Sequence, residues 1–166
     1  MKAISQPDMS LHTIEVQIDE QFRAQVQSEP LYCAALETVA RQRMKEPCEL
    51  AVVVTGDGTL HELNRRHRGV DEPTDVLAFP DETRGPFVGA PGFPRYLGDV
   101  IISFPRAKAQ AVEAGHDIQA ELQLLVVHGV LHLLGYDDVT DAQRAGMWAA
   151  QADILQALGV KVHLPA

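Results

Sequence analysis

The stretch HGVLHLLGYDD, residues 128–138, carries two histidines four positions apart inside an apolar run. Residues four apart on an α-helix lie on the same face, one turn above the other. The pattern therefore predicts a helix, over about residues 118–134, on which the imidazoles of His128 and His132 converge. Gly135 suits the left-handed position that ends a helix and reverses the chain. This reversal can swing the acids that follow back toward the histidines.

Two imidazoles and one carboxylate, from Asp137 or Asp138, would supply three metal ligands and leave a coordination position open. An open position distinguishes a catalytic zinc site from a structural one. The spacing also arises by chance, and a histidine on a core helix usually finds hydrogen-bond partners instead. Zinc peptidases carry a glutamate directly after the first histidine as general base. Here that position is Gly129, which argues against a peptidase of that mechanism.

Working outward from this helix, hydrophobic periodicity predicts a small sheet with helices packed against it. The predicted strands are residues 12–18, 49–55, 74–79 and 97–103. Helices are predicted from Ser28 onward, after the GDG turn at 56–58, over about 105–114, over about 118–134, and from a Thr140–Gln143 capping box to Gly159. The first helix should bury a stripe of Leu31, Ala35, Leu36, Val39 and Ala40, and the second should bury Leu60, Leu63 and His67. Residues 80–96 hold four prolines and three glycines, which predicts an irregular connection.

Composition and charge restrict the function classes. The net charge of -9 works against indiscriminate nucleic-acid binding, although NRRHR, residues 64–68, forms either a local basic patch or a solvated helix face. No apolar run approaches the ~20 residues of a membrane span. The N-terminal residues lack the apolar core of a signal peptide, so we expect a cytoplasmic protein. Cys33 and Cys48 belong to no C-x-x-C pair and are expected to be free thiols.

The histidine stretch resembles the H-G-x-L-H-L-x-G-Y-D-H signature of the bacterial YbeY family, metal-dependent endoribonucleases of ribosomal RNA maturation. LNRRHRGVDEPTDVLAFP, residues 63–80, is similar to the family segment L-N-x-x-Y-R-x-x-D-x-P-T-D-V-L-S-F-P, and LGDVIIS, residues 97–103, falls where the family has its L-G-D strand. The three motifs occur in the family's order, and the resemblance covers about residues 12–159. It implies an α+β fold with a small mixed sheet of about four strands and about five helices, a zincin-like single metal-dependent hydrolase domain over residues 1–166.

The resemblance implies that His128 and His132 are zinc ligands and that Arg68 faces the metal cleft. Asp138 stands where the family has its third histidine ligand. An aspartate can bind zinc, but its side chain is shorter, so the loop must move closer, Asp137 must take the role, or a water must bridge. An anionic ligand also lowers the net positive charge at the ion. Because two histidines and a carboxylate also form the ligand set of non-haem iron oxygenases, another divalent metal can replace zinc.

The function implied is that of a zinc-dependent, single-strand-specific endoribonuclease acting in rRNA maturation, including 16S rRNA 3′ end processing, and in ribosome quality control. Its partners would be RNA, ribosomal RNA and the small ribosomal subunit above all, without a membrane. The ion would polarise a phosphoryl oxygen, hold the attacking water, or both. Arg68 would bind the phosphate and stabilise the charge of the transition state.

Three features are left open at this stage. Asp75 and Asp99 are candidate bases, although each is expected to brace the sheet. Arg84 or Arg95 of the long connection can contact RNA. Two other functions also fit the residues: a metal-dependent hydrolase of another substrate class, such as peptides, and a ribosome-associated binding module whose metal site has decayed, as Asp138 would then indicate.

Overall fold

A computed structural model describes residues 11–42, 46–81 and 94–163. Along the chain the elements are β1 (Thr13–Ile18), a short 3₁₀ helix η1 (Glu20–Phe22), α1 (Ser28–Arg41), β2 (Cys48–Thr55), α2 (Asp57–Arg68), β3 (Val76–Pro80), β4 (Arg95–Ser103), α3 (Phe104–Ala114), α4 (Ile118–Leu133) and α5 (Asp141–Leu158). The strands form one sheet in the order β1-β2-β4-β3. β1, β2 and β4 are parallel, and β3 is antiparallel to β4 at the edge.

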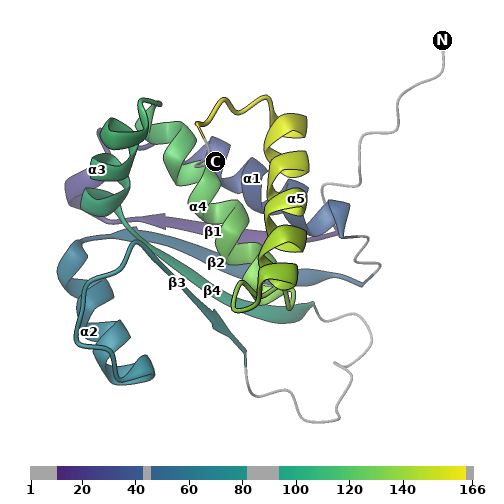
Figure 1. Cartoon of the computed structure of the whole chain (residues 1–166), viewed down its shortest axis with the longest axis horizontal. Coiled ribbons are helices and arrows are strands. Elements are labelled where there is room, and N and C mark those ends of the chain that lie inside the picture. Colours follow the sequence, from purple (N-terminus) through teal and green to yellow (C-terminus); the bar gives the residue numbers. More distant parts are fainter. Residues whose placement is uncertain (1–10, 43–45, 82–93, 164–166) are drawn as a thin grey trace.

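Helices cover both faces of this sheet. Figure 1 shows α1, α4 and α5 together on one side and α2 on the other. The main core lies between the sheet and the first group, and its fully buried members include Leu31, Val52, Val100, Val126 and Met147. On the opposite side α2 contacts β3 and β4, where Leu60 and Leu77 are buried. The sheet is therefore a platform that holds α4 on one face and the last turn of α2 near its β3 edge.

The predicted mixed sheet of four strands with five α-helices is confirmed for the residues that the structure describes. β3 begins at Val76, two residues later than predicted, and β4 begins at Arg95, two residues earlier. Two burial predictions are wrong. Ala40 is exposed, because the buried stripe of α1 runs through Ala34 and Thr38 instead. His67 is exposed in the solvated last turn of α2, with its ring edge-on to Phe79 at 5.2 Å between centroids.

The predicted irregular connection is described only at its two ends, because residues 82–93, Arg84 among them, lie outside the described ranges. Arg95 is exposed at the first position of β4. Cys33 and Cys48 are not joined in a disulfide. None of the described helices has the length and apolar character that a membrane span needs.

Candidate metal centre

The end of α4 is built as the sequence predicts. Gly135 has a φ of 101°, a left-handed conformation that residues with a Cβ rarely adopt. The Tyr136 N–H donates to the carbonyl oxygen of Leu131 at 3.0 Å, and the Gly135 N–H donates to that of His132 at 3.1 Å. These bonds close the last turn of the helix and reverse the chain. The residues after Gly135 therefore return alongside the final turn of α4.

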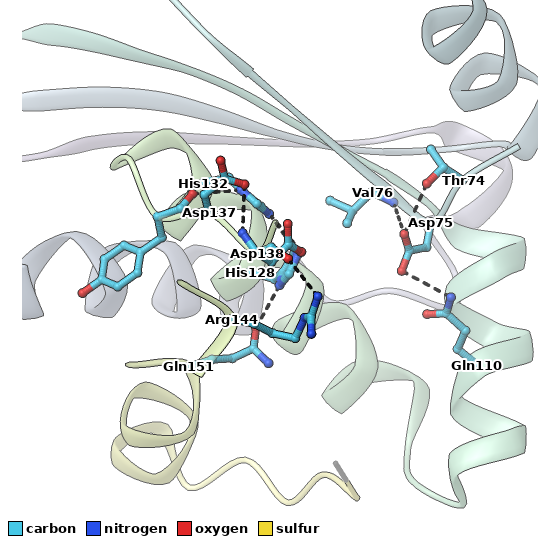
Figure 2. Close-up of polar contacts among 11 residues, drawn as sticks. Thr74, Asp75, Val76, Gln110, His128, His132, Asp137, Asp138, Arg144 and Gln151 are labelled. Atoms are coloured by element: carbon cyan, nitrogen blue, oxygen red, sulfur yellow. Dashed lines mark hydrogen bonds and ion pairs between the residues drawn. The ribbon is translucent and has the colours of Figure 1, made fainter. Parts of the chain in front are cut away.

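This reversal brings one acid to the two histidines. The Nε2 atoms of His128 and His132 lie 3.2 Å apart. Oδ2 of Asp138 is 3.9 Å from the first and 3.8 Å from the second. Among the described residues, these three side chains form the group of donors that can hold a metal ion, and Figure 2 shows them converging. Asp137 is not a member of this group, and its exposed carboxylate accepts the Asp138 N–H at 2.8 Å.

Hydrogen bonds at the other ring nitrogens fix both imidazoles in the form that binds a metal. Nδ1 of His132 donates to the carbonyl oxygen of Tyr136 at 3.0 Å, and Nδ1 of His128 donates to Oε1 of Gln151 at 3.1 Å. Trp148 packs edge-on against the His128 ring. In neutral rings with Nδ1 protonated, each Nε2 carries a lone pair. Two lone pairs that face each other at 3.2 Å repel unless a cation lies between them.

The donor set fits a tetrahedral divalent ion. With zinc–ligand bonds of about 2.0–2.1 Å, ligand atoms at tetrahedral angles lie about 3.3 Å apart. The two Nε2 atoms meet this spacing at 3.2 Å. The Asp138 oxygen is about half an ångström too far, which a small movement of the loop corrects. The side chains are partly open to solvent, at 18% for His128, 27% for His132 and 38% for Asp138. Substrate can therefore approach the group.

The electrostatics favour the neutral form of His128. Burial lowers the pKa of this imidazole, and the neighbouring His132 ring lowers it further. The hydrogen bond that His128 donates to Gln151 and the charges of Asp138 and Asp75 act in the opposite direction without reversing the shift in pKa. A neutral imidazole is the form that donates its lone pair to a metal.

The glycine after the first histidine has a packing cause. A Cβ at Gly129 would lie 2.5 Å from Cγ1 of Val100 on β4, so the backbone of α4 rests directly on the strand. A glutamate at position 129 would press into the buried sheet rather than reach the metal ligands. The peptidase arrangement that the sequence argues against is therefore also excluded by the seating of the helix.

Neither acid that the sequence offered as a base is free at this site. Val100 faces α4, and successive residues of a strand point to opposite faces, so Asp99 points away from the histidines. Asp99 accepts a hydrogen bond from the Tyr96 hydroxyl instead. Asp75 accepts from the Val76 N–H at 2.8 Å and from Nε2 of Gln110 at 3.2 Å (Figure 2). Both acids brace the sheet, as the sequence led us to expect.

Arg68 is the last residue of α2, exposed and followed by Gly69 in the left-handed conformation. Arg65 and Arg66, earlier in the same turn, pair with Glu62. Among the interactions of the described residues, none joins Arg68 to an acid or to the two histidines. Its guanidinium charge is therefore available to an anionic ligand.

A hollow of about 760 Å³ opens elsewhere, at the carboxyl ends of β1 and β2. Ile18, Arg23 and Thr55 are among the residues that line it, and the histidines are not. It holds no convergent set of metal donors, because His128, His132 and Asp138 are the group that the described residues offer. The candidate metal ligands therefore lie outside this hollow, at the end of α4.

Two residues near this site were not found from the sequence. Gln151, buried on α5, orients His128 and was hidden in an apolar stripe with Met147, Ile154 and Leu155. A polar residue at that spacing is the signal that could have found it. Arg144, one turn into α5, donates to the carbonyl oxygen of Asp138 at 3.4 Å. Nothing in its local sequence indicates that contact.

Comparisons with known proteins identify the family of this chain. The family model described as Endoribonuclease YbeY matches residues 13–159. The Endoribonuclease YbeY of Chloroflexus aurantiacus is 49% identical over 152 residues, which cover 90% of this chain and 97% of that protein. The chain belongs to the YbeY family of endoribonucleases. The Endoribonuclease YbeY of Roseiflexus castenholzii is 44% identical over 148 residues, covering 89% of this chain and 93% of that protein.

A solved structure supports the architecture as well. The solution structure of a Thermotoga maritima protein matches 88% of this chain and 89% of its own, with a TM-score of 0.58 and 25% sequence identity. The three segments that resemble YbeY motifs lie on α2 with β3, on β4, and on α4 with its final turn. These elements share the strands β3 and β4, since α2 and α4 each contact both of them from opposite faces of the sheet. The YbeY motifs therefore surround one part of the molecule.

Proposed function

We propose that this protein is a zinc-dependent endoribonuclease whose ligands are His128, His132 and Asp138. The observation that carries the proposal is the convergence of two imidazole nitrogens and one carboxylate oxygen, with both rings held by hydrogen bonds at Nδ1. Membership of an endoribonuclease family supports RNA as the substrate class. A divalent ion at such a site polarises a phosphoryl oxygen and activates water, which is the chemistry that phosphodiester hydrolysis needs.

The protein's own residues have distinct tasks in this proposal. His128 and His132 present lone pairs, and Gln151 and the Tyr136 carbonyl keep those lone pairs aimed at one point. Asp138 completes the ligand set from the returning loop. Arg68 binds the scissile phosphate through its planar guanidinium and stabilises the charge that builds in the transition state.

We infer a cellular role from the family resemblance. The substrate is single-stranded ribosomal RNA, with the 3′ end of 16S rRNA as the site of processing, and the protein works on the small ribosomal subunit in maturation and quality control. The protein is a single metal-dependent hydrolase domain and acts in the cytoplasm. The low density of positive charge, with a net charge of -9, supports local rather than indiscriminate RNA contact.

The substrate class is tested directly by incubating the pure protein with structured RNA containing single-stranded regions and with casein, each with and without chelator. The proposal predicts RNA cleavage that the chelator abolishes and no cleavage of casein. Chelator-sensitive casein cleavage would favour a hydrolase of another substrate class. Intact RNA with a protein free of transition metal would favour a binding module.

Arg68→Ala tests the phosphate contact. We expect RNA cleavage to fall about 100-fold or more, because one donor to the transition-state charge is lost, while metal content stays at the wild-type level. Arg41→Ala is the matched control, since Arg41 also ends a helix and is exposed, with Glu37 as its partner. Wild-type cleavage rates in the Arg68 variant would remove this residue from the mechanism.

A further inference from the structure

Arg144 lies beside the Asp138 ligand although it belongs to another element. The Thr140–Gln143 capping box fixes the start of α5 immediately after the loop that carries Asp138. Long side chains on a helix lean toward its N-terminus, so the Arg144 side chain reaches back over this loop. Its Nη2 donates to the carbonyl oxygen of Asp138 at 3.4 Å, and Figure 2 shows the guanidinium next to Asp138 and His128.

The guanidinium is only loosely held by its present partners. Nη1 of Arg144 donates to Oδ1 of Asp141 at 3.1 Å, but that carboxylate is fully exposed and the arginine side chain is 48% exposed. An exposed ion pair three residues apart on a helix is weak, because solvent screens it and both side chains lose rotamer freedom. A guanidinium has five N–H donors, so Arg144 retains donors for a second acceptor while its contact with the Asp138 carbonyl persists.

The net charge of the metal site determines how strongly it attracts a phosphate group. A divalent ion held by two neutral imidazoles and the Asp138 carboxylate carries a net charge of +1, whereas three neutral imidazoles would leave it at +2. The anionic ligand also faces any phosphate that approaches. Arg144 contacts the backbone of that ligand. Its permanent positive charge therefore compensates for the negative charge of the Asp138 carboxylate.

We propose that Arg144 is a phosphate-binding residue of this site, which compensates for the aspartate ligand and contacts the phosphodiester backbone of the substrate. This inference rests on the proposed function, because the phosphate it binds is that of single-stranded RNA. Arg68 ends α2 and Arg144 lies on α5, so the two proposed phosphate-binding guanidinium groups come from different elements.

The test is binding rather than cleavage. A fluorescein-labelled, single-stranded 2′-O-methyl RNA oligonucleotide is titrated with metal-loaded protein at several salt concentrations, and its integrity is checked by gel. Arg144→Gln should weaken binding about fivefold to tenfold and reduce the slope of log K against log salt by about 0.7, the value for one phosphate contact on a single strand. Arg144→Lys keeps the charge and should recover most of the affinity, with metal content unchanged in both variants.

Arg41→Gln is the matched control, because Arg41 is 45% exposed and pairs with Glu37 on its own helix. It should leave affinity and salt slope unchanged. Equal losses of oligonucleotide affinity in the Arg41 and Arg144 variants would contradict the proposed role of Arg144. An Arg144→Gln variant with wild-type affinity and salt slope would contradict it as well, and neither result would affect the proposed function. A wild-type protein that neither binds nor cleaves RNA would overturn the proposed function, and this inference with it.

A double variant separates charge compensation from simple attraction. Asp138→His removes the anionic ligand, so the subsequent loss of Arg144 should weaken oligonucleotide binding by no more than about twofold if compensation is the cause. The same fivefold to tenfold loss in both backgrounds would show that Arg144 does not act through the charge of Asp138, and would contradict that part of the proposal.

Discussion

The side chain of Asp138 gives this site its particular chemistry, because a short anion stands where a longer neutral ring would reach the same point. Its oxygen stops 3.8–3.9 Å from the two Nε2 atoms, although the turn at Gly135 has already brought the loop close. The two histidines, in contrast, already have the spacing that a tetrahedral ion needs, since their Nε2 atoms lie 3.2 Å apart. The third ligand is thus the weakest part of the donor set.

Asp138→His should therefore tighten zinc binding, by about tenfold if the longer side chain gains about 1.4 kcal/mol from better ligand geometry. Competition with a chromophoric chelator measures the change in Kd. Weaker binding in this variant would show that position 138 does not face the ion, and Asp138→Ala with unchanged affinity would lead to the same conclusion.

Site residues that lie close together in the sequence could be predicted, whereas site residues from distant parts of the chain could not. The spacing of His128 and His132 on one helix, with Gly135 after it, determines where those groups lie, because helix geometry is local. The choice between Asp137 and Asp138 depended on loop geometry and stayed open. Gln151 and Arg144 reach the site from α5, and only the packing of α5 on α4 brings them there.

At the scale of elements, the contact between α4 and β4 sets the height of the histidines above the sheet. Gly129 lets the helix backbone rest against Val100, where a Cβ would approach Cγ1 to 2.5 Å. The same close contact explains why position 129 cannot supply a base. The absence of a side chain at Gly129 therefore both allows α4 to pack closely on β4 and leaves the site without a base at this position.

Gly129→Ala should destabilise the fold by about 1–3 kcal/mol, because the added methyl group forces α4 away from β4. Gly146 on α5 is the matched control, since a Cβ there would meet nothing within 4 Å. Gly146→Ala should stabilise the protein by up to about 1 kcal/mol through helix propensity alone. Urea unfolding of both variants measures the two changes in free energy, and a stabilised Gly129→Ala variant would refute the account of the contact.

Element types followed from periodicity, whereas their exact ends and exposed faces did not. The capping box at Thr140 and the stop at Gly159 are as predicted, because both depend on neighbouring residues. Ala40 and His67 were wrongly assigned to buried faces. Both lie near the C-terminal ends of their helices, where the neighbouring elements no longer cover the helix surface. That position is a property of the sheet and not of the helix sequence.

At the scale of the whole molecule, the first two strands are joined by a buried polar contact. Nδ1 of His12 accepts a hydrogen bond from the backbone N–H of Cys48 at 3.2 Å, beside the starts of β1 and β2. Burial lowers the pKa of His12 from its usual value. Protonation would both charge a buried ring and remove this acceptor, so the folded state favours the neutral form.

Stability should therefore depend on pH through His12. The unfolded chain binds the proton at the ordinary pKa of about 6.5 and the folded chain only at lower pH, so this contribution is fully present above pH ~6.5 and is lost as the pH falls below it. We expect the free energy of unfolding to decrease less between pH 7.5 and 5.5 in His12→Asn than in the wild type. Identical decreases in urea titrations would contradict this role.

The parallel pairing of β1, β2 and β4, with β3 at the edge, could not be derived from any single segment. Strand order depends on contacts between distant residues, and the resemblance to YbeY motifs predicted only a mixed sheet of about four strands. The metal site depends on local and long-range structure together, since it needs the spacing of the histidines on α4, the turn at Gly135 and the packing of α5 on α4.

Elemental analysis of protein purified without chelators tests the central claim most directly. We expect about one divalent transition-metal ion per chain in the wild type, and almost none in His128→Ala, whose fold is verified by circular dichroism. Wild-type protein without metal, or a folded His128→Ala variant that keeps the full complement, would contradict the claim that these histidines hold the ion.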